Sequence, residues 1–257
     1  MSGLEGFTAE EILHETLIMP RSALHLLPGA RIIERPGFWQ LVTPALRTGG
    51  MNEVGTCILD PNADVDAVID AAIGEYRSLG IQFRWNVVPG SRPIDLGERL
   101  KARGLEEVPV RAMAASTQGH QLRPLEARVE RVDQSNVAEF TQVTAQGWGM
   151  DPAPARPLHQ RMLADPRNQL YLAREGREPA GVASFVAFPR SAYLIGGVVL
   201  PKFRHRGLFQ AIVDAMLHDL AVRGIPLATT VAIESTSAPI VERLGFHTIA
   251  RFSEYMG

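Results

Sequence analysis

A glycine at the start of an amphipathic segment follows a cluster of positive charge in the sequence LPKFRHRGLFQAIVDAML. The residues that carry or can acquire positive charge are Lys202, Arg204, His205 and Arg206. Gly207 then opens an apolar pattern with the period of a helix, whose first turn has unpaired backbone N–H groups and a partial positive charge. Glycine lets the backbone approach a ligand closely, and arginine side chains match phosphate oxygens. The segment therefore predicts a phosphate-binding site; a solvated basic turn is the alternative that the charges alone leave open.

Other phosphate, metal and thiol sites receive no support from the motifs. The pattern G-x-x-x-x-G-K-[ST] does not occur, which excludes a nucleotide P-loop, and no G-x-G-x-x-G follows an expected strand. The seven histidines have no spacing typical of metal ligands, so we expect no metal site. The single cysteine, Cys57, excludes an intrachain disulfide and lies in an expected buried strand, where a reactive thiol is not expected.

Composition limits the class of protein and its partners. A chain of 257 residues with 46% hydrophobic residues can form one large or two ordinary domains. The net charge of −2 argues against nucleic acid as the main partner, because phosphate-backbone binding needs a basic face. The N-terminus has no basic region before an apolar one, and no apolar run approaches the ~18 residues of a membrane span. We therefore expect a cytoplasmic protein without a membrane partner.

The order of expected elements divides the chain into two halves. A polar stretch, Ala115–Glu126, is interpreted as a linker. After it we expect the order β-α-α-β-β-β-α-β-α-β, with a Pro-rich loop GWGMDPAPARP between the first two helices and the longest helix at 207–222. The first half has a partly similar order of helices and strands. We therefore predict an α/β protein (an α+β mixed sheet) with domains 1–120 and 121–257.

The basic turn and its surroundings resemble a known family as a set. VVLPKFRHRGLFQAIV resembles the cofactor-binding signature of the GCN5-related N-acetyltransferases (GNAT), R/Q-x-x-G-x-G/A after a strand that ends in V-x-P, and ERLGF follows at a matching distance. The resemblance covers the C-terminal ~130 residues and implies the GNAT fold. FRWNVVPGSRPIDLGERL in the first half lacks a basic glycine turn. It resembles the degenerate second copy of tandem members.

By this resemblance, the anion is the pyrophosphate of acetyl-CoA, the implied co-substrate. Backbone N–H groups of the basic turn would hold it, and the strand before the turn would pair with the pantetheine arm. Gly196 and Gly197 fit a bulge that separates neighbouring strands near the thioester. The implied cofactor contacts are Val198, Val199, Leu200, Arg204, His205, Arg206, Gly207, Leu208, Phe209 and Ser237.

Two positions depart from the family pattern, and one of them means that the catalytic acid must be sought at another residue. Phe209 stands where the signature has a small residue, so its ring must point away from the diphosphate. Val241 stands where the family often has a tyrosine that protonates the thiolate. We name Glu234 as candidate base and Tyr255 as candidate acid, with capping and packing as their respective alternatives. Trp148 is the candidate acceptor-binding residue, with a core anchor as its alternative.

The resemblance implies an N-acetyltransferase that acts on a primary amine of a small molecule or a protein or peptide. The alternative is a CoA-binding module with weak or no catalysis, because Val241 cannot do acid chemistry. A helix-turn-helix-like DNA binder is disfavoured, since the apolar face of the segment after Gly207 must be buried. Monomer and homodimer are both left open.

Overall fold

The chain forms two compact units that differ from the expected domains. The computed structural model describes residues 4, 6–48, 51–121 and 128–257. Within this part of the chain, unit 1 comprises 1–25 and 111–250, and unit 2 comprises 26–110 and 251–257. The expected boundary at residue 120 therefore does not coincide with the division in the structure. Whether the first half is a degenerate copy of the second stays a prediction.

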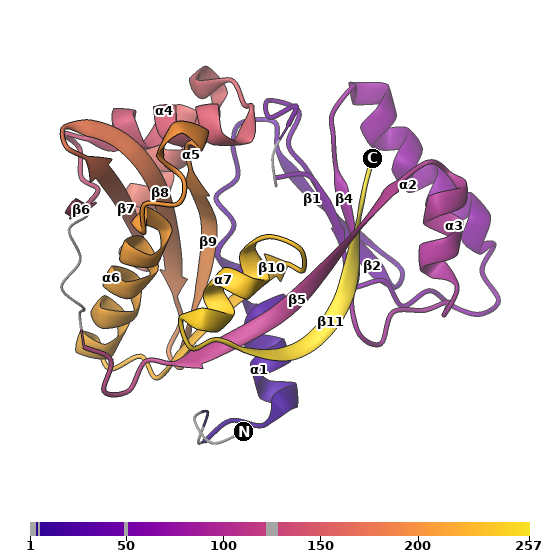
Figure 1. Cartoon of the computed structure of the whole chain (residues 1–257). Helices are drawn as coiled ribbons and strands as arrows, with labels where there is room; N and C mark the ends of the chain where they lie inside the picture. Colours follow the sequence, from indigo (N-terminus) through magenta and orange to yellow (C-terminus); the bar gives the residue numbers. More distant parts are fainter. Residues whose placement is uncertain (1–3, 5, 49–50, 122–127) are drawn as a thin grey trace. The chain divides into compact units, whose positions relative to one another are not determined.

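The division lies elsewhere because two long strands belong to both units. Strands β5 (Glu106–Ser116) and β11 (His247–Met256) each begin in one unit and end in the other, and they are neighbours in the sheet (Figure 1). The expected linker is also changed, since Ala115 and Ser116 belong to β5 and residues 122–126 lie outside the described residues. Helix α1 (Ala9–Leu17) belongs to unit 1, where Ile12 is buried with Leu227.

The described strands form one mixed sheet, which confirms the predicted fold class. Their order is β1-β2-β3-β4-β11-β5-β10-β9-β8-β7-β6. The remaining strands are β1 (Arg31–Arg35), β2 (Phe38–Val42), β3 (Glu53–Gly55), β4 (Arg84–Val87), β6 (Arg128–Arg131), β7 (Asn168–Glu175), β8 (Glu178–Ala187), β9 (Ser191–Val199) and β10 (Leu227–Ile233). The remaining helices are α2 (Val65–Leu79), α3 (Leu96–Ala102), α4 (Val137–Trp148), α5 (Pro152–Ala164), α6 (Leu208–Val222) and α7 (Ser237–Arg243), with 3₁₀ turns η1 (Met19–Ala23) and η2 (Pro201–Phe203).

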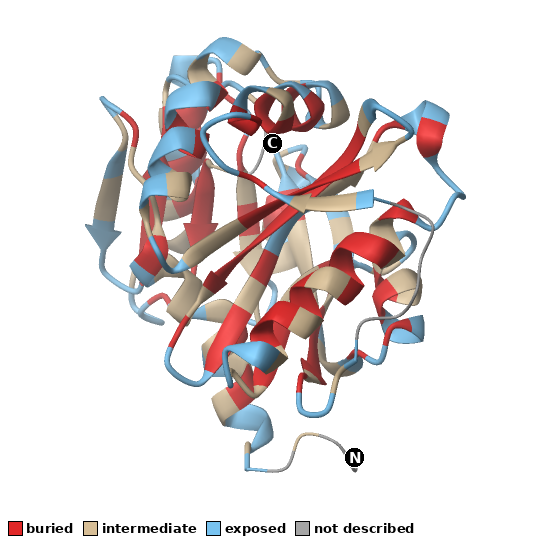
Figure 2. Cartoon of the chain, turned by 90° about the vertical axis from the view of Figure 1, so that its left-hand side faces the viewer, coloured by how far each residue is buried: buried red, intermediate tan, exposed pale blue. Residues whose placement is uncertain are grey.

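In unit 1, helices α4 and α6 pack on opposite faces of β9. A methyl group added at Gly147 in α4 would lie 2.5 Å from the side chain of Val198. A methyl group added at Gly181 in β8 would contact both Val199 and Ile212 of α6. Because consecutive residues of a strand point to opposite faces, these contacts assign the two helices to different sides. The middle residues of β7 and β8 are buried, whereas the helices carry stripes of buried and exposed residues (Figure 2).

Helix α5 replaces most of the expected Pro-rich loop. It begins at Pro152, after Asp151, whose side chain accepts a hydrogen bond from the backbone N–H of Ala153 at 2.9 Å. Proline is tolerated in the first turn because the N–H group that it lacks has no partner there. Pro157 lies further inside the helix. The consequence for the site is that Trp148 is the last residue of α4 rather than part of a long loop.

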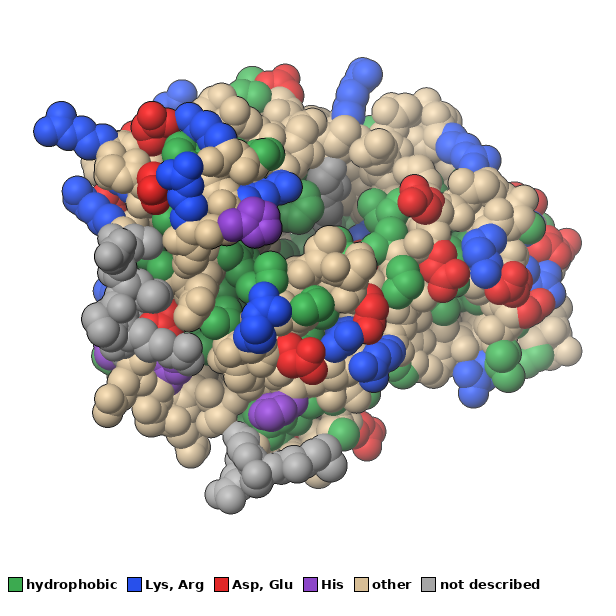
Figure 3. Space-filling model, in the orientation of Figure 1, with side chains coloured by type: hydrophobic (Ala, Val, Ile, Leu, Met, Phe, Trp, Pro, Cys, Tyr) green, Lys and Arg blue, Asp and Glu red, His purple; other side chains and the backbone are tan. Residues whose placement is uncertain are grey.

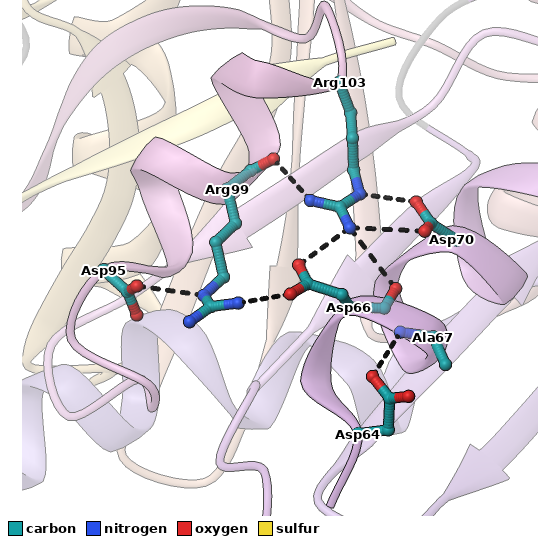
Figure 4. A network of polar contacts seen from close by, with 7 residues as sticks. All are labelled: Asp64, Asp66, Ala67, Asp70, Asp95, Arg99 and Arg103. Atoms are coloured by element: carbon teal, nitrogen blue, oxygen red, sulfur yellow. Dashed lines mark hydrogen bonds and ion pairs between the residues drawn. The ribbon is translucent and has the colours of Figure 1, made fainter.

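Unit 2 has its own core on one face of its strands. Helix α2 contributes Ile69 and Tyr76 to this core, beside Trp85 of β4. Five charged side chains also connect helices α2 and α3 (Figure 4). Two arginines, one in α3 and one directly after it, form ion pairs with three aspartates. These residues are Asp66, Asp70, Asp95, Arg99 and Arg103. Since the aspartates are about half exposed or more, we attribute most of the stability of unit 2 to its apolar core.

The charged surface and the helices concern the two partners that the sequence argued against, nucleic acid and membranes. On the face in Figure 3, Lys and Arg side chains lie among Asp and Glu side chains. The apolar face of α6, with Ile212, Met216 and Leu220, is buried in the core of unit 1, as the argument against a DNA-reading helix required. That nucleic acid is no partner stays a prediction. Among the described residues, no helix is long and apolar enough to cross a membrane.

We expect the stability of the protein to fall in mild acid because of His159. This residue of α5 is buried, contacts Thr141 of α4 at 2.9 Å, and its burial lowers its pKa from 6.5 to about 4. The unfolded chain therefore binds a proton that the folded chain excludes. The free energy of unfolding then decreases as the pH falls from 6.5 towards 4, with a slope that approaches about 1.4 kcal/mol per pH unit.

Urea unfolding at several pH values in that range measures this slope. The His159→Gln variant does not titrate there and is expected to have a shallower dependence on pH than the unmodified protein. Equal slopes for the two proteins would contradict the assignment.

Candidate donor and acceptor site

Strands β9 and β10 pair over only part of their length, and this opens the sheet. In the described residues, their parallel register runs from Ser191–Leu227 to Tyr193–Thr229. Beyond that point β9 continues to Val199 and β10 to Ile233. Backbone groups of β9 in this opening no longer have a partner on β10 and are available to a ligand.

A bulge in β9 accompanies the opening. The register of β9 against β8 shifts between Val182, which faces Val198, and Ser184, which faces Ile195. The two glycines Gly196 and Gly197 take up the shift, and Gly196 has a φ of 71°, which favours glycine. This confirms the expected place of the bulge. The hydroxyl of Thr230 donates to the Leu194 carbonyl oxygen at 3.0 Å and satisfies a β9 group that β10 no longer pairs.

The basic turn connects β9 to α6 and presents the start of the helix. Leu200 is buried, and its N–H donates to the Ala180 carbonyl oxygen at 2.9 Å, so its side chain belongs to the core. His205 and Gly207 both have positive φ, 63° and 75°. Gly207 is the N-cap of α6 and makes no side-chain cap, and an added methyl group there would meet no atom within 4 Å. The space beside Gly207 at the uncapped start of α6 is therefore open, which fits a phosphate group.

The charged side chains of the turn are exposed, and two of them form ion pairs with exposed carboxylates. Arg206 lies 2.9 Å from Glu175, and Lys202 lies 2.6 Å from Glu178. The Arg204 Nε–H donates to the Val199 carbonyl oxygen at 3.2 Å. Exposed ion pairs contribute little, about 0–1 kcal/mol each, so an incoming anion can displace these carboxylates at small cost.

Phe209 points to the bulge, as its size required. A methyl group added at Gly197 would lie 2.6 Å from the Phe209 ring. The ring thus occupies the space that a side chain at Gly197 would need, on the α6 face of β9. Leu208, by contrast, is buried in the core of unit 1 and offers a ligand only its backbone N–H. The departure of Phe209 from the family signature is therefore matched by the glycine opposite it.

Glu234 follows β10 directly, and the structure gives it a partner that the sequence did not indicate. Its carboxylate forms an ion pair with Arg111 of β5, which also lies 3.4 Å from Glu242 of α7. The Glu234 carboxylate is the main cause that raises the pKa of Arg111. A carboxylate paired in this way stays charged and oriented. Ser237, an expected cofactor contact, accepts a hydrogen bond from the Ile233 N–H at 2.8 Å at the start of α7.

Tyr255 does not have the surroundings of a proton donor, which corrects the candidate acid. It lies in the core of unit 2 and is 5% exposed, with its hydroxyl against Gly97. Burial and the nearby Glu107 carboxylate raise the pKa of Tyr255, which makes it a weaker acid. The structure therefore supports the packing alternative. Val241, which stands where the family often has a tyrosine acid, is buried and apolar.

Trp148 is exposed at the end of α4, the helix that packs on β9 through Gly147. It ends α4 next to Gly147, which contacts Val198, and its side chain is 46% exposed. This excludes the alternative of a core anchor but leaves acceptor binding a prediction. No group of His, Cys, Asp and Glu that suits a metal ion occurs among the described residues.

The geometry is therefore a strand opened beside a bulge, followed by a basic glycine turn and a helix start. Residues 136–255 match the acetyltransferase (GNAT) domain. The C-terminal half of the chain belongs to the GNAT acetyltransferase family. Members of this family use an acyl-CoA as donor. The strand and turn described above are thus the part of the GNAT domain where the donor is expected.

Solved structures with the same fold extend over nearly the whole chain. A GCN5-related N-acetyltransferase from Kribbella flavida has a TM-score of 0.66 at 16% identity, covering 98% of this chain and 96% of its own. A protein of unknown function from Staphylococcus epidermidis has a TM-score of 0.65 at 12% identity, covering 91% and 96%. A tandem GNAT protein from the clavulanic acid biosynthesis pathway has a TM-score of 0.56 at 14% identity, covering 86% and 78%. No curated protein has significant sequence similarity to the chain.

The sequence arguments missed Arg111, because nothing in a strand pattern 123 residues before Glu234 signals a pairing across the sheet. They also missed Ile195 and Ile233. These side chains have the alternation of ordinary strand residues, and their exposure follows only from the separation of β9 and β10.

We expect the contact between Gly197 and Phe209 to limit what residue 197 can be. Gly197→Ala places a methyl group against the ring and should lower the free energy of unfolding by about 1–3 kcal/mol, because the packing is already close. Gly197→Ala combined with Phe209→Ala should recover part of that loss. Urea unfolding of the four proteins of this cycle measures the coupling.

Gly74→Ala is the control, since an added methyl group in α2 meets no atom within 4 Å. It should leave stability unchanged or raise it slightly. Additive effects of the substitutions at 197 and 209 would contradict the contact.

Proposed function

We propose that the protein transfers an acetyl group from acetyl-CoA to a primary amine of a small molecule or a peptide. The observation that carries this proposal is the open, uncapped start of α6 at Gly207, placed at the end of a strand that has separated from its neighbour. Acetyl-CoA supplies the activated acetyl group as a thioester. Backbone N–H groups from Arg204 to Phe209 would hold its pyrophosphate, with Arg206 and His205 beside them.

The reaction requires a neutral amine, a polarised acetyl carbonyl group and a proton for the departing thiolate. The amine nitrogen forms a bond to the acetyl carbon, the carbon–sulfur bond breaks, the amine loses a proton and the thiolate gains one. The unpaired backbone of β9 around the bulge can donate a hydrogen bond to the acetyl oxygen as charge develops there. Val198 and Val199 would offer backbone groups to the pantetheine arm.

Proton transfer from the amine is assigned to Glu234 in this proposal. It lies at the end of β10, and Arg111 holds its carboxylate charged and oriented. A charged carboxylate accepts a proton, directly or through one water molecule. The thiolate then takes its proton from solvent, because Tyr255 is in the core of unit 2 and Val241 is apolar.

The second candidate is a CoA-binding module with weak or no catalysis. This candidate is favoured because neither Tyr255 nor Val241 is suited to protonate the thiolate. The two candidates share the donor site and differ in turnover. Thiol release with a panel of amines separates them.

We expect acetyl-CoA to bind with micromolar affinity and Gly207→Asp to reduce that affinity by about a hundredfold or more. The substituted carboxylate would stand where phosphate is expected and repel it. Gly224→Asp is a matched control at the other end of α6, because Gly224 has a φ of 71° and is equally open. Calorimetric titration measures both. If the unmodified protein does not bind acetyl-CoA, or both variants lose binding equally, the donor site is wrong.

We expect Glu234→Gln to lower kcat by about 100-fold or more while the Kd for acetyl-CoA is unchanged, as for a lost general base. Glu242→Gln is the control, since Glu242 also contacts Arg111 but is more exposed. The rate of thiol release against pH measures the effect. If both variants lower kcat equally, Glu234 acts through structure alone.

A further inference from the structure

Exposed apolar side chains of unit 1 concentrate at the opening between β9 and β10. The large apolar residues exposed in the described part of unit 1 are Ile18, Trp148, Ile195, Val222 and Ile233. Two of them lie on the strands of the opening, Ile195 on β9 and Ile233 at the end of β10. A third, Trp148, ends α4 next to Gly147, which packs against Val198 of β9. Scattered exposed apolar residues are ordinary, but several around one opening mark a binding surface.

The strand registers place these residues on one face. Residues opposite each other in a sheet share a face, and Ile195 lies opposite Ser184 while Val198 lies opposite Val182. Val182 and Ser184 are two residues apart on β8, so all four side chains point the same way. Val198 contacts Gly147 of α4, so this is the α4 face, on which Trp148 ends the helix. Ile195 is therefore exposed on the face of β9 that α4 covers, and Trp148 is the last residue of that helix.

Ile233 shares this face through the other strand. Tyr193 is two residues before Ile195 and pairs in register with Thr229. Thr229 and Ile233 are four residues apart in β10, so their side chains also point the same way. The donor turn lies at α6, which packs on the opposite face of β9. The apolar residues thus flank the opening on the side away from the phosphate site.

The side-chain hydroxyl and carboxylate groups of β10 and its end are already paired. The hydroxyl groups of Thr229 and Thr230 donate to carbonyl oxygens of β9 at 3.4 Å and 3.0 Å. The carboxylate next to Ile233 is Glu234, which Arg111 neutralises. An acceptor with several positive charges would need carboxylates without such partners. An apolar acceptor would instead remove Trp148 and the isoleucines from water.

We propose that the acceptor is a primary amine on an aromatic or branched aliphatic body, which Trp148, Ile195 and Ile233 contact. This inference rests on the proposed function. The amine nitrogen reaches the acetyl group from the α4 side, and the body of the acceptor covers the ring of Trp148.

The test compares amines of two kinds with the full-length protein. We expect 2-phenylethylamine and tryptamine to be acetylated with a higher kcat/KM than spermidine or kanamycin, measured by thiol release. Trp148→Ala should raise the KM for 2-phenylethylamine about tenfold, as for one lost aromatic contact, and leave the Kd for acetyl-CoA unchanged. Trp148→Phe should restore most of the affinity. Val222→Ala is the control, because Val222 is an exposed apolar residue at the far end of α6 and should change neither constant.

Binding is also read without turnover. Trp148 is exposed while Trp39 and Trp85 are buried, so 2-phenylethylamine should change the fluorescence of the protein and not that of Trp148→Phe. If acetyl-CoA binds but spermidine or kanamycin is preferred, or no aromatic amine is accepted, the acceptor class is wrong and the donor site stands. Tighter binding of octanoyl-CoA than of acetyl-CoA, lost in Trp148→Ala, would assign the surface to the acyl chain and overturn the inference. If acetyl-CoA itself does not bind, the proposed function and this inference both fall.

Discussion

The separation of β9 from β10 beyond Tyr193 and Thr229 is the feature on which the donor and acceptor sides of the site depend. Paired parallel strands use their backbone groups on each other, so a ligand can reach those groups only where pairing stops. The bulge at Gly196 and Gly197 accompanies this separation on the β8 side of β9. The Phe209 ring packed at Gly197 then ties the bulge to the first turn of α6. One contact therefore sets the position of the phosphate site relative to the open strand.

A site made mainly of backbone groups explains how the fold persists at low identity. The structures similar to this chain share 12–16% of its residues with coverage above 85% of it. Unpaired N–H groups at a helix start and along an opened strand do not depend on side-chain identity, apart from glycines where the backbone needs positive φ. In the proposed donor site, Arg206 would add charge to groups that the backbone provides.

Proton transfer is where this chain departs most from the family pattern. An apolar Val241 is buried where a tyrosine often stands, and Tyr255 serves the core of unit 2. Glu234 is held by Arg111 through an ion pair. Under the proposed function, these observations leave neither Tyr255 nor Val241 to protonate the thiolate. They also agree with an acceptor side that is apolar, because a hydrophobic body desolvates the amine beside it.

The sequence by itself determined the local features of the protein. The α/β class, the helix after Gly207, the strands that became β7, β8 and β9, and the bulge were all predicted to within a few residues, because period, turn residues and glycine conformation are properties of neighbouring residues. The contact of the Phe209 ring with Gly197 was not predicted and comes from the structure. The Pro-rich stretch was mistaken for a loop, since capping by Asp151 outweighs the usual effect of proline. Only the tertiary structure decided the division into units across β5 and β11, the pairing of Arg111 with Glu234, the burial of Tyr255 and the exposure of Ile195 and Ile233. Each of these depends on which strands become neighbours and where they separate, and residues far apart in the chain make those contacts without a local signal.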